Sequence, residues 1–236
     1  MYIQVRHTAS YRVTSRRSLD DARSRPSVDL ACIRWVRQYT GSAMSGNLRY
    51  FDFGQAMRLL DIGCGTNKTP GAIGMDKIPL PGVDIIHDLN AFPYPFADSS
   101  FDEIYATHVI EHLDSIVRAM EEIHRLAKPN AKVVIVTPHY SDCSSWNDPT
   151  HKWHLSTYSF RYFREGYRES YYSKARFETE LIHIDMARLW RALGFEGLIN
   201  SSLRHQALRF VSKFWECYLS LIVRAGAMTF VLRAVK

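Results

Sequence analysis

Short apolar runs separated by polar turns dominate the chain between residues 58 and 137. Their Leu, Ile and Val content predicts strands at 58–62, 72–76, 83–87, 103–108 and 132–137. The last run is continuously β-branched, which is typical of a strand covered on both faces. Strands that alternate with crossovers indicate a parallel sheet, whose ligands bind at the carboxyl ends of the strands.

An amphipathic helix is expected at 115–127, because Ile116, Met120 and Ile123 recur at helical spacing. The sequence Lys128-Pro129-Asn130 should end it, since proline cannot continue a helix. A second, short helix is expected at 30–39 in an otherwise aperiodic segment.

The pattern is less regular after residue 138. We expect an aromatic-rich insertion at 139–185 near the active site, a strand at 177–184, a helix at 186–193 ended by Gly194, a strand at 195–200, a helix at 203–223 and a closing strand at 227–235. The insertion could form either a lid over a substrate or the core of a small subdomain, through Trp146, Trp153, Tyr158, Phe160, Tyr162 and Phe163. The apolar side of 203–223 could pack on the sheet or a second copy, or lie on a membrane surface.

The first crossover is too short for a normal helix. Ten residues separate Gly65 from Asp76, whereas a crossover with its helix needs about a dozen or more. Pro70 and Gly71 also lie in the middle of this segment. We therefore expect the first crossover helix to be absent or cut to a turn, which would leave a more open cleft.

Charge separates an N-terminal extension from the rest. Residues 1–50 contain nine arginines, no lysine and three aspartates, which accounts for the whole net charge of +6. We interpret 1–50 as a basic, disordered extension, or as a sign that translation starts downstream at Met44 or Met57. Residues 51–236 should form one folded domain. Because the net charge of this domain is zero, it is not expected to present a basic face to nucleic acid, although the arginine-rich segment 1–50 could bind nucleic acid.

Several classes of protein are excluded by composition. No uncharged apolar run reaches the ~18 residues of a membrane span, and no secretory signal is recognisable at the N-terminus. The four scattered cysteines form no CxxC pair, which indicates reduced thiols rather than a zinc site. We expect a cytoplasmic protein, and no pattern indicates its oligomeric state.

The sequence from Leu59 to Gly65, LLDIGCG, carries the most specific chemical signal. An apolar strand stops in a turn with two glycines, and an acid, Asp76, ends the next apolar run. Glycines let a backbone approach a ligand without a Cβ clash, and an acid can accept hydrogen bonds from ribose hydroxyls. This arrangement suits a cofactor that contains adenosine.

These residues resemble the class I S-adenosylmethionine-dependent methyltransferases, in particular a small-molecule branch with a reduced first helix. The shared motifs are LDIGCG at 60–65, GMD at 74–76, Asp88-Leu89 and HVIEH at 108–112. The short-form trait is carried by Thr66 to Gly71 and by the sequence Asp-Pro-Thr-His at 148–151. The resemblance implies a Rossmann-like, mostly parallel sheet with an antiparallel C-terminal strand. The family's third glycine is replaced by Asn67, which bears on cofactor affinity.

The resemblance assigns a cofactor role to nine positions. Gly63 and Gly65 would face the methionine part of S-adenosyl-L-methionine, and Asp61 would help to hold its amino group. Asp76 would bind the ribose hydroxyls. Asp88 and Leu89 would contact the adenine, and His108 would lie near the methyl-bearing sulfonium. The set is completed by Cys64 and Lys77.

Methyl transfer to oxygen or nitrogen can need a base, for which histidine is suited near neutral pH. The catalytic candidates are His151, His139 and His108; a loop-stabilising hydrogen bond is the other interpretation of His151, and His108 could line the cofactor site instead. Glu111 and His112 are expected to start the helix that follows. A metal site from His139, Asp148, His151 and His154 matches no known spacing, so no metal is predicted.

We therefore expect a methyltransferase that acts on a small-molecule or glycan-type acceptor, at oxygen or nitrogen. A nicotinamide-dependent oxidoreductase would need a third glycine where Lys68 stands and an acid further along the chain. A nucleic-acid base methyltransferase would need an Asn/Asp-Pro-Pro-Tyr/Phe motif, which Thr137-Pro138-His139-Tyr140 does not match. A non-catalytic cofactor-binding or interaction module is the alternative.

Overall fold

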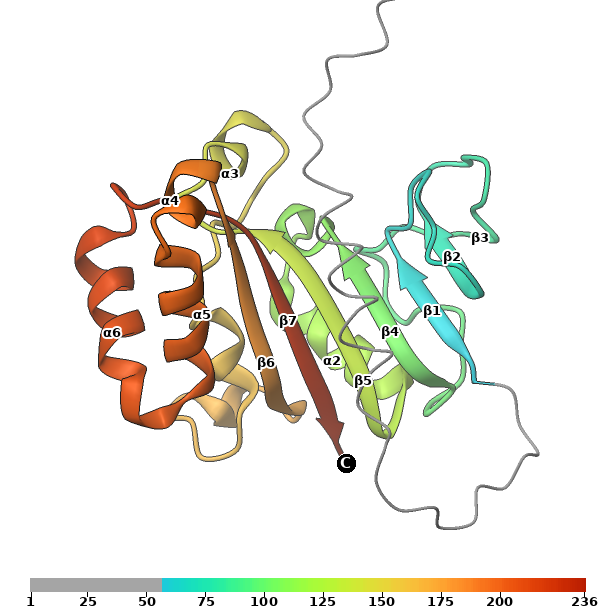
Figure 1. The fold of residues 1–236 in the computed structure, drawn as a ribbon. Coiled ribbons are helices and arrows are strands. Elements are labelled where there is room, and N and C mark those ends of the chain that lie inside the picture. Colours follow the sequence, from blue (N-terminus) through green and yellow to red (C-terminus); the bar gives the residue numbers. More distant parts are fainter. Residues whose placement is uncertain (1–56) are drawn as a thin grey trace, which may run out of the picture. The chain divides into compact units, whose positions relative to one another are not determined.

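The computed structural model describes residues 57–236, and the helix expected at 30–39 lies outside them. Within the described part, the chain forms one seven-stranded sheet with helices around it (Figure 1). The strands are β1 (Leu59–Ile62), β2 (Ala72–Asp76), β3 (Ile85–Ile86), β4 (Phe101–Thr107), β5 (Ala127–Pro138), β6 (Arg176–Met186) and β7 (Ala225–Val235). All seven correspond to predicted strands.

The strand order is β3-β2-β1-β4-β5-β7-β6. Strands β1 to β5 pair in parallel, and β7 runs antiparallel to both β5 and β6. This confirms a Rossmann-like sheet with an antiparallel C-terminal strand. No helix lies between β1 and β2, as the short crossover predicted. The carboxyl ends of β1, β2, β3 and β4 therefore share one edge, at the top of Figure 1.

Helix α2 (Ile116–Leu126) confirms the periodicity of its sequence. Ser115 caps it by accepting a hydrogen bond from the Arg118 amide, and the helix ends just before the predicted Lys-Pro-Asn stop. Its apolar side is buried in the core of the sheet. Core residues of the sheet and helix that are at most 1 % exposed include Leu60, Ile62, Met75, Ile104, Met120, Ile123, Val133 and Ile135.

The remaining helices of the described part are α3 (Ser144–Asn147), α4 (Arg188–Ala192), α5 (Phe195–Arg204) and α6 (Arg209–Phe214), with 3₁₀ turns η1 (Ile110–His112), η2 (Ser159–Phe163), η3 (Ser170–Tyr172) and η4 (Gln206–Leu208).

The region after β6 differs from the prediction in two places. The strand predicted at 195–200 is wrong, because these residues begin α5. The helix predicted at 203–223 is also wrong as one element: His205 is extended, and a π-turn, η5 (Trp215–Leu219), follows α6.

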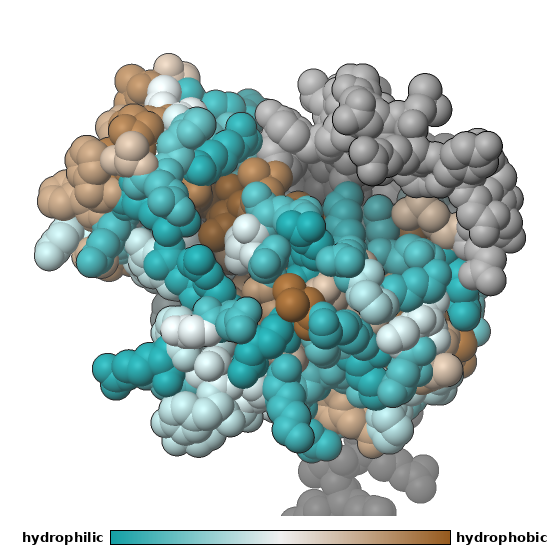
Figure 2. Space-filling view, turned by 90° about the horizontal axis from the view of Figure 1, so that it is seen from below, coloured by the Kyte–Doolittle hydropathy of each residue, from teal (hydrophilic) through white to brown (hydrophobic). Residues whose placement is uncertain are grey.

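The aromatic-rich insertion is divided between the core and the surface. Phe160 and Phe163 are buried in the core, whereas Trp146 and Trp153 are 63 % and 41 % exposed. The α5–α6 side also exposes apolar residues, visible as a brown area on that side in Figure 2. They include Leu198, Phe210, Phe214, Tyr218, Leu221 and Ile222. No helix within residues 57–236 is long and apolar enough to cross a membrane.

Candidate functional site

The glycine turn after β1 packs directly on the segment that follows β4. Gly63 and Gly65 have φ values of +66° and +50°, which glycine adopts without strain. The Gly63 amide donates to the Met75 carbonyl at 2.7 Å. A Cβ atom at Gly63 would lie 2.5 Å from Val109 Cγ2, so only glycine fits here. The turn is thus fixed between β2 and the segment that carries His108.

The carboxylate of Asp76 faces the same turn from the end of β2. Its Oδ2 accepts the Gly65 amide at 2.9 Å, and its Oδ1 accepts the Ile78 amide at 3.1 Å. Each carboxylate oxygen can accept more than one hydrogen bond. The backbone therefore holds Asp76 in one orientation and leaves capacity for donors from a ligand. A pair of ribose hydroxyls would supply such donors.

Asp61 supports the turn from inside. It is 4 % exposed, and its Oδ2 accepts the Thr69 amide at 2.6 Å. Burial raises the pKa of Asp61 above its usual range, although the hydrogen bonds from Thr69 act against this. Burial, together with the charges of Asp61 and Asp76, also raises the pKa of the Cys64 thiol to about 11. The Cys64 thiol is thus uncharged and buried against the turn, and it is not a nucleophile.

We expect Asp61 to give the protein a distinct pH dependence. Since its folded pKa is raised, its contribution to stability is complete below the unfolded pKa of about 3.9 and is lost as pH rises through the folded pKa. Asp61→Asn removes this loss while keeping an acceptor for Thr69. The free energy of unfolding of Asp61→Asn, relative to wild type, should therefore increase as the pH rises above about 4, measured by urea titrations at a series of pH values. A constant difference over this range would contradict the raised pKa.

The other predicted cofactor residues lie along the same edge. Lys77 and Asp88 are exposed beside β2 and after β3, and Leu89 is buried, with its carbonyl accepting the Tyr94 hydroxyl. A further feature was not predicted: Lys68 pairs with Asp84 at 2.7 Å. A Cβ atom on Gly74 would lie 2.5 Å from Cδ of Lys68, so the aliphatic part of the Lys68 side chain packs directly against Gly74. This pair ties the short crossover to the loop between β2 and β3.

His108 directly follows β4, next to the glycine turn. It is exposed, and its Nδ1 lies 3.4 Å from Oε1 of the buried Glu111. Its φ of +52° is in the left-handed region, which is uncommon for residues other than glycine. Such backbone conformations often accompany functional sites, because the surrounding structure must enforce them.

This strain can be measured with two variants. His108→Gly and His108→Ala remove the same imidazole, but only alanine retains the left-handed penalty of about 1–2 kcal/mol. We therefore expect the glycine variant to be more stable than the alanine variant by about that amount. Urea unfolding of both proteins tests this directly. Equal stabilities would mean that the backbone relaxes at no cost.

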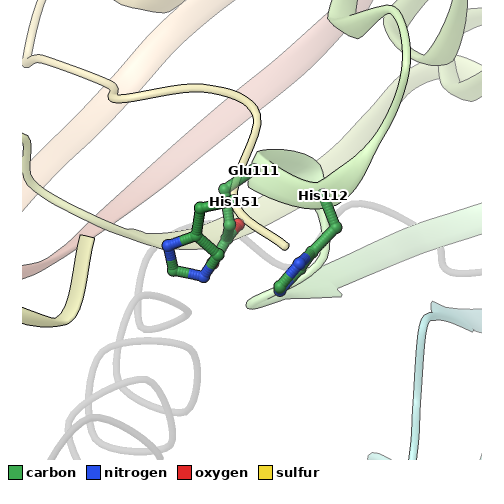
Figure 3. A group of neighbouring side chains, drawn as sticks. All are labelled: Glu111, His112 and His151. Atoms are coloured by element: carbon green, nitrogen blue, oxygen red, sulfur yellow. The ribbon is translucent and has the colours of Figure 1, made fainter. Parts of the chain in front are cut away.

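Glu111 and His112, which the sequence analysis expected to start the following helix, lie next to His108. Figure 3 shows Glu111 and His112, from η1, next to His151, from the loop after α3. Nitrogen or oxygen atoms of these three side chains all lie within 4.8 Å of one another. The structure thus brings His108 and His151 close to the same carboxylate. The adjacent Glu-His pair in HVIEH was the only signal of this in the sequence.

His139 lies apart from this group. It is fully buried, and its Nε2 is 3.2 Å from Oε1 of Glu216, whose Oε2 accepts the Thr157 hydroxyl at 2.7 Å. Its Nδ1 is hydrogen-bonded to the Ser141 hydroxyl. A substrate cannot reach this ring, and its contacts explain it as a structural residue. The π-turn after α6 supplies the partner, which sequence periodicity could not indicate.

A cavity of about 940 Å³ lies at the opposite end of the sheet. It is lined by residues of η2, β6 and α5, including Arg161, Arg176 and Arg204. Arg176 pairs with Val235 at the end of β7, at the amino ends of the parallel strands. Figure 2 views this end and shows the hollow. The cavity is therefore separate from the glycine turn.

Comparison with known proteins gives a consistent result. A family profile described as "Methyltransferase domain" matches residues 35–198. The O-methyltransferase rstn1 of Aspergillus nomiae is 26 % identical over 139 residues, which is 49 % of this chain and 58 % of that protein. The 2-phytyl-1,4-naphtoquinone methyltransferase of a Nostoc species is 28 % identical over 80 residues, 34 % of each chain. The chain spans about half the length of the Aspergillus relatives it matches.

Among solved structures, a SAM-dependent methyltransferase from Archaeoglobus fulgidus superposes with a TM-score of 0.54 at 16 % identity. The alignment covers 86 % of this chain and 93 % of the other. At this identity the similarity concerns the fold, and it agrees with the strand order described above.

Proposed function

The chain belongs to the class I S-adenosylmethionine-dependent methyltransferases, and we propose that it transfers the methyl group of S-adenosylmethionine to oxygen or nitrogen of a small-molecule or glycan-type acceptor. The observation that carries this proposal is the Asp76 carboxylate, which two backbone amides hold against the glycine turn. The remaining acceptor capacity of that carboxylate fits a diol such as ribose.

The residues at this edge fit the cofactor in chemistry as well as in position. Asp76 would bind the ribose, and the open backbone at Gly65, where a Cβ would meet nothing within 4 Å, leaves room for the methionine part. Asp88 and Leu89 would lie at the adenine, and Asp61 would support the amino group through the turn. When bound, the cofactor supplies an electrophilic methyl group on a sulfonium.

We assign the base to His108. His108 would accept the proton that the acceptor oxygen or nitrogen gives up when it is methylated. His108 is exposed and follows β4 beside the glycine turn. Glu111, 3.4 Å from its Nδ1, would stabilise the positive charge that forms on the ring. The protein's main contribution is to align the acceptor and exclude water.

The names of the relatives favour a small, oxygen-bearing acceptor, since they are an O-methyltransferase and a naphthoquinone methyltransferase. Two exposed tryptophans support an acceptor with a flat face. Trp146 stacks on His154 at 3.6 Å between ring centroids, and the indole N–H of Trp153 donates to the Leu113 carbonyl. Trp146 belongs to α3, and Trp153 to the following loop, which carries His151.

The proposal is tested by measuring S-adenosylhomocysteine formation with a panel of phenols, quinols, amines and free sugars. Turnover with one class, absent without acceptor, would support the proposal and identify the acceptor. Binding of S-adenosylhomocysteine without turnover of any class would favour a non-catalytic cofactor-binding module. No binding by a folded protein would reject both and favour an interaction module.

A further inference from the structure

Glu111 is an unusual buried residue. It is 1 % exposed, and neither oxygen of its side chain accepts a hydrogen bond from any group within residues 57–236. A buried carboxylate without hydrogen bonds is costly, so such a group in a native protein needs a cation or an ordered ligand to compensate it. Glu111 lies beside His151 and close to His112 (Figure 3), and possible ligand atoms of the three side chains are within 4.8 Å of one another.

The ring of His112 is held in a defined protonation pattern. The Thr150 hydroxyl donates its hydrogen to Asp148 Oδ1 at 2.6 Å, so its oxygen can only accept from His112 Nδ1, 2.9 Å away. His112 therefore carries its proton on Nδ1. Its Nε2 is left with a lone pair.

His151 follows the same rule. Its Nδ1 lies 3.0 Å from the Ser145 carbonyl, which can only accept, so the proton must be on Nδ1 here too. In its neutral form each imidazole thus presents an Nε2 lone pair while the other nitrogen donates to an oxygen; Nε2 of His151 also lies 3.9 Å from Oδ2 of Asp148. This is the arrangement of histidines that bind metal ions in proteins.

We propose that Glu111, His112 and His151 form a binding site for a divalent transition-metal ion, of which Zn²⁺ fits best. Two neutral imidazoles and one carboxylate are a ligand set that zinc accepts, with a further position open. Mg²⁺ and Ca²⁺ prefer sites built mostly from oxygen. Metal–ligand bonds of about 2.0–2.2 Å place ligand atoms roughly 3.5 Å apart. The three side chains, now within 4.8 Å, need only small rotations to reach this spacing.

The backbone already brings the two halves of the site together. The amides of Lys152 and Trp153 donate to the Glu111 carbonyl at 2.8 and 3.3 Å, which fixes the loop of His151 on η1. Lys152 also pairs with Asp114. The site would therefore form by rotation of side chains on a fixed backbone.

The site adjoins the proposed base, since Glu111 lies 3.4 Å from His108. A metal with an open position could bind an acceptor oxygen there and lower its pKa. This role rests on the proposed function, whereas metal binding itself does not.

The test is a calorimetric titration with ZnCl₂ of the full chain, without a histidine tag and after removal of metal with a chelator. We expect one Zn²⁺ per chain with a Kd in the micromolar range or below. A hundredfold excess over Kd should raise the midpoint of thermal unfolding by about 5–10 °C. Glu111→Gln and His151→Ala should each weaken binding more than tenfold. MgCl₂ should give no heat.

Two further variants distinguish a specific Zn²⁺ site from adventitious Zn²⁺ binding. Thr150→Val removes only the hydroxyl that orients His112, at an exposed position, and should weaken Zn²⁺ binding by about 10–100-fold without unfolding the protein. His154→Ala removes an exposed imidazole of the same loop that is not in the cluster, and should leave the Kd unchanged. Absence of Zn²⁺ binding by wild type, equal losses in His154→Ala and His151→Ala, or an unchanged Thr150→Val would each overturn the proposal.

The stability of metal-free Glu111→Gln adds an independent readout. If Glu111 is a metal ligand, the metal-free Glu111→Gln variant should unfold at the same urea concentration as wild type or at a higher one, because the substitution removes an uncompensated charge. If Glu111 is instead compensated by a protonated histidine, the variant should be less stable, and the metal site is rejected. Titration of the metal-free protein with S-adenosylhomocysteine tests the methyltransferase assignment separately.

Discussion

Replacing Asp76 with alanine is expected to weaken the binding of S-adenosylhomocysteine by tenfold to several hundredfold. Hydrogen bonds from ribose hydroxyls to a carboxylate contribute roughly 1.5–3 kcal/mol each, and about 1.4 kcal/mol corresponds to a factor of ten in Kd. Asp76→Asn keeps an acceptor for the Gly65 amide but loses the charge, so its effect should be intermediate. Calorimetric titration of the three proteins gives the ranking.

A matched control removes a carboxylate elsewhere. Asp98 is an exposed partner of Arg125, remote from the glycine turn in sequence and strand position, and Asp98→Ala should bind like wild type. Since Asp76→Ala also leaves the Gly65 and Ile78 amides without their acceptor, its fold must be checked by circular dichroism. A folded Asp76→Ala with the affinity of wild type would show that the ribose is held elsewhere.

The second large effect is expected at Gly63. A Cβ there would lie 2.5 Å from Val109 Cγ2 and 2.7 Å from its Cβ, and φ is +66°. Gly63→Ala should therefore cost about 1–2 kcal/mol of backbone strain and a further 1–3 kcal/mol, roughly, of overpacking. Gly65→Ala carries the same kind of strain at φ +50° but meets nothing within 4 Å. In urea unfolding, Gly63→Ala should be the less stable variant by about the overpacking energy.

For the affinity for S-adenosylhomocysteine we expect the opposite ranking: among variants that fold, Gly65→Ala should bind more weakly than Gly63→Ala. Gly65 is open on the side where the cofactor is proposed to lie, so a methyl group there should weaken S-adenosylhomocysteine binding although it destabilises the fold less. Val109→Ala combined with Gly63→Ala should recover part of the lost stability, with a coupling of about 0.5–3 kcal/mol. Additive effects would mean that Val109 does not define the space at Gly63.

Local patterns predicted the elements whose sequence and environment agree. The strands β1, β2, β4 and β5 are short apolar runs that are buried in a parallel sheet, and α2 has one apolar side and a serine cap. The absent first crossover helix followed from chain length alone, because ten residues with a central proline leave no room for it.

The segment 195–200 shows where local patterns fail. Its apolar residues suit a strand, but β6 takes no further strand at this edge. Instead, α5 covers it: the Asn200 side chain accepts from the Ile184 amide and donates to the Ile184 carbonyl, and Glu196 accepts the Met186 amide. Side chains of a helix thus satisfy backbone groups of the edge strand, which periodicity cannot reveal.

The sequence by itself determined the strands, the glycine turn and the acid that faces it, because each depends on residues close together in the chain. Only the tertiary structure decided the roles of the histidines. It buried His139 beside Glu216, which is 77 residues away, and it brought Glu111 and His112 to His151, which follows them by 40 and 39 residues. The physical reason is that burial and hydrogen-bond partners fix what an imidazole can do, and both depend on contacts between distant segments.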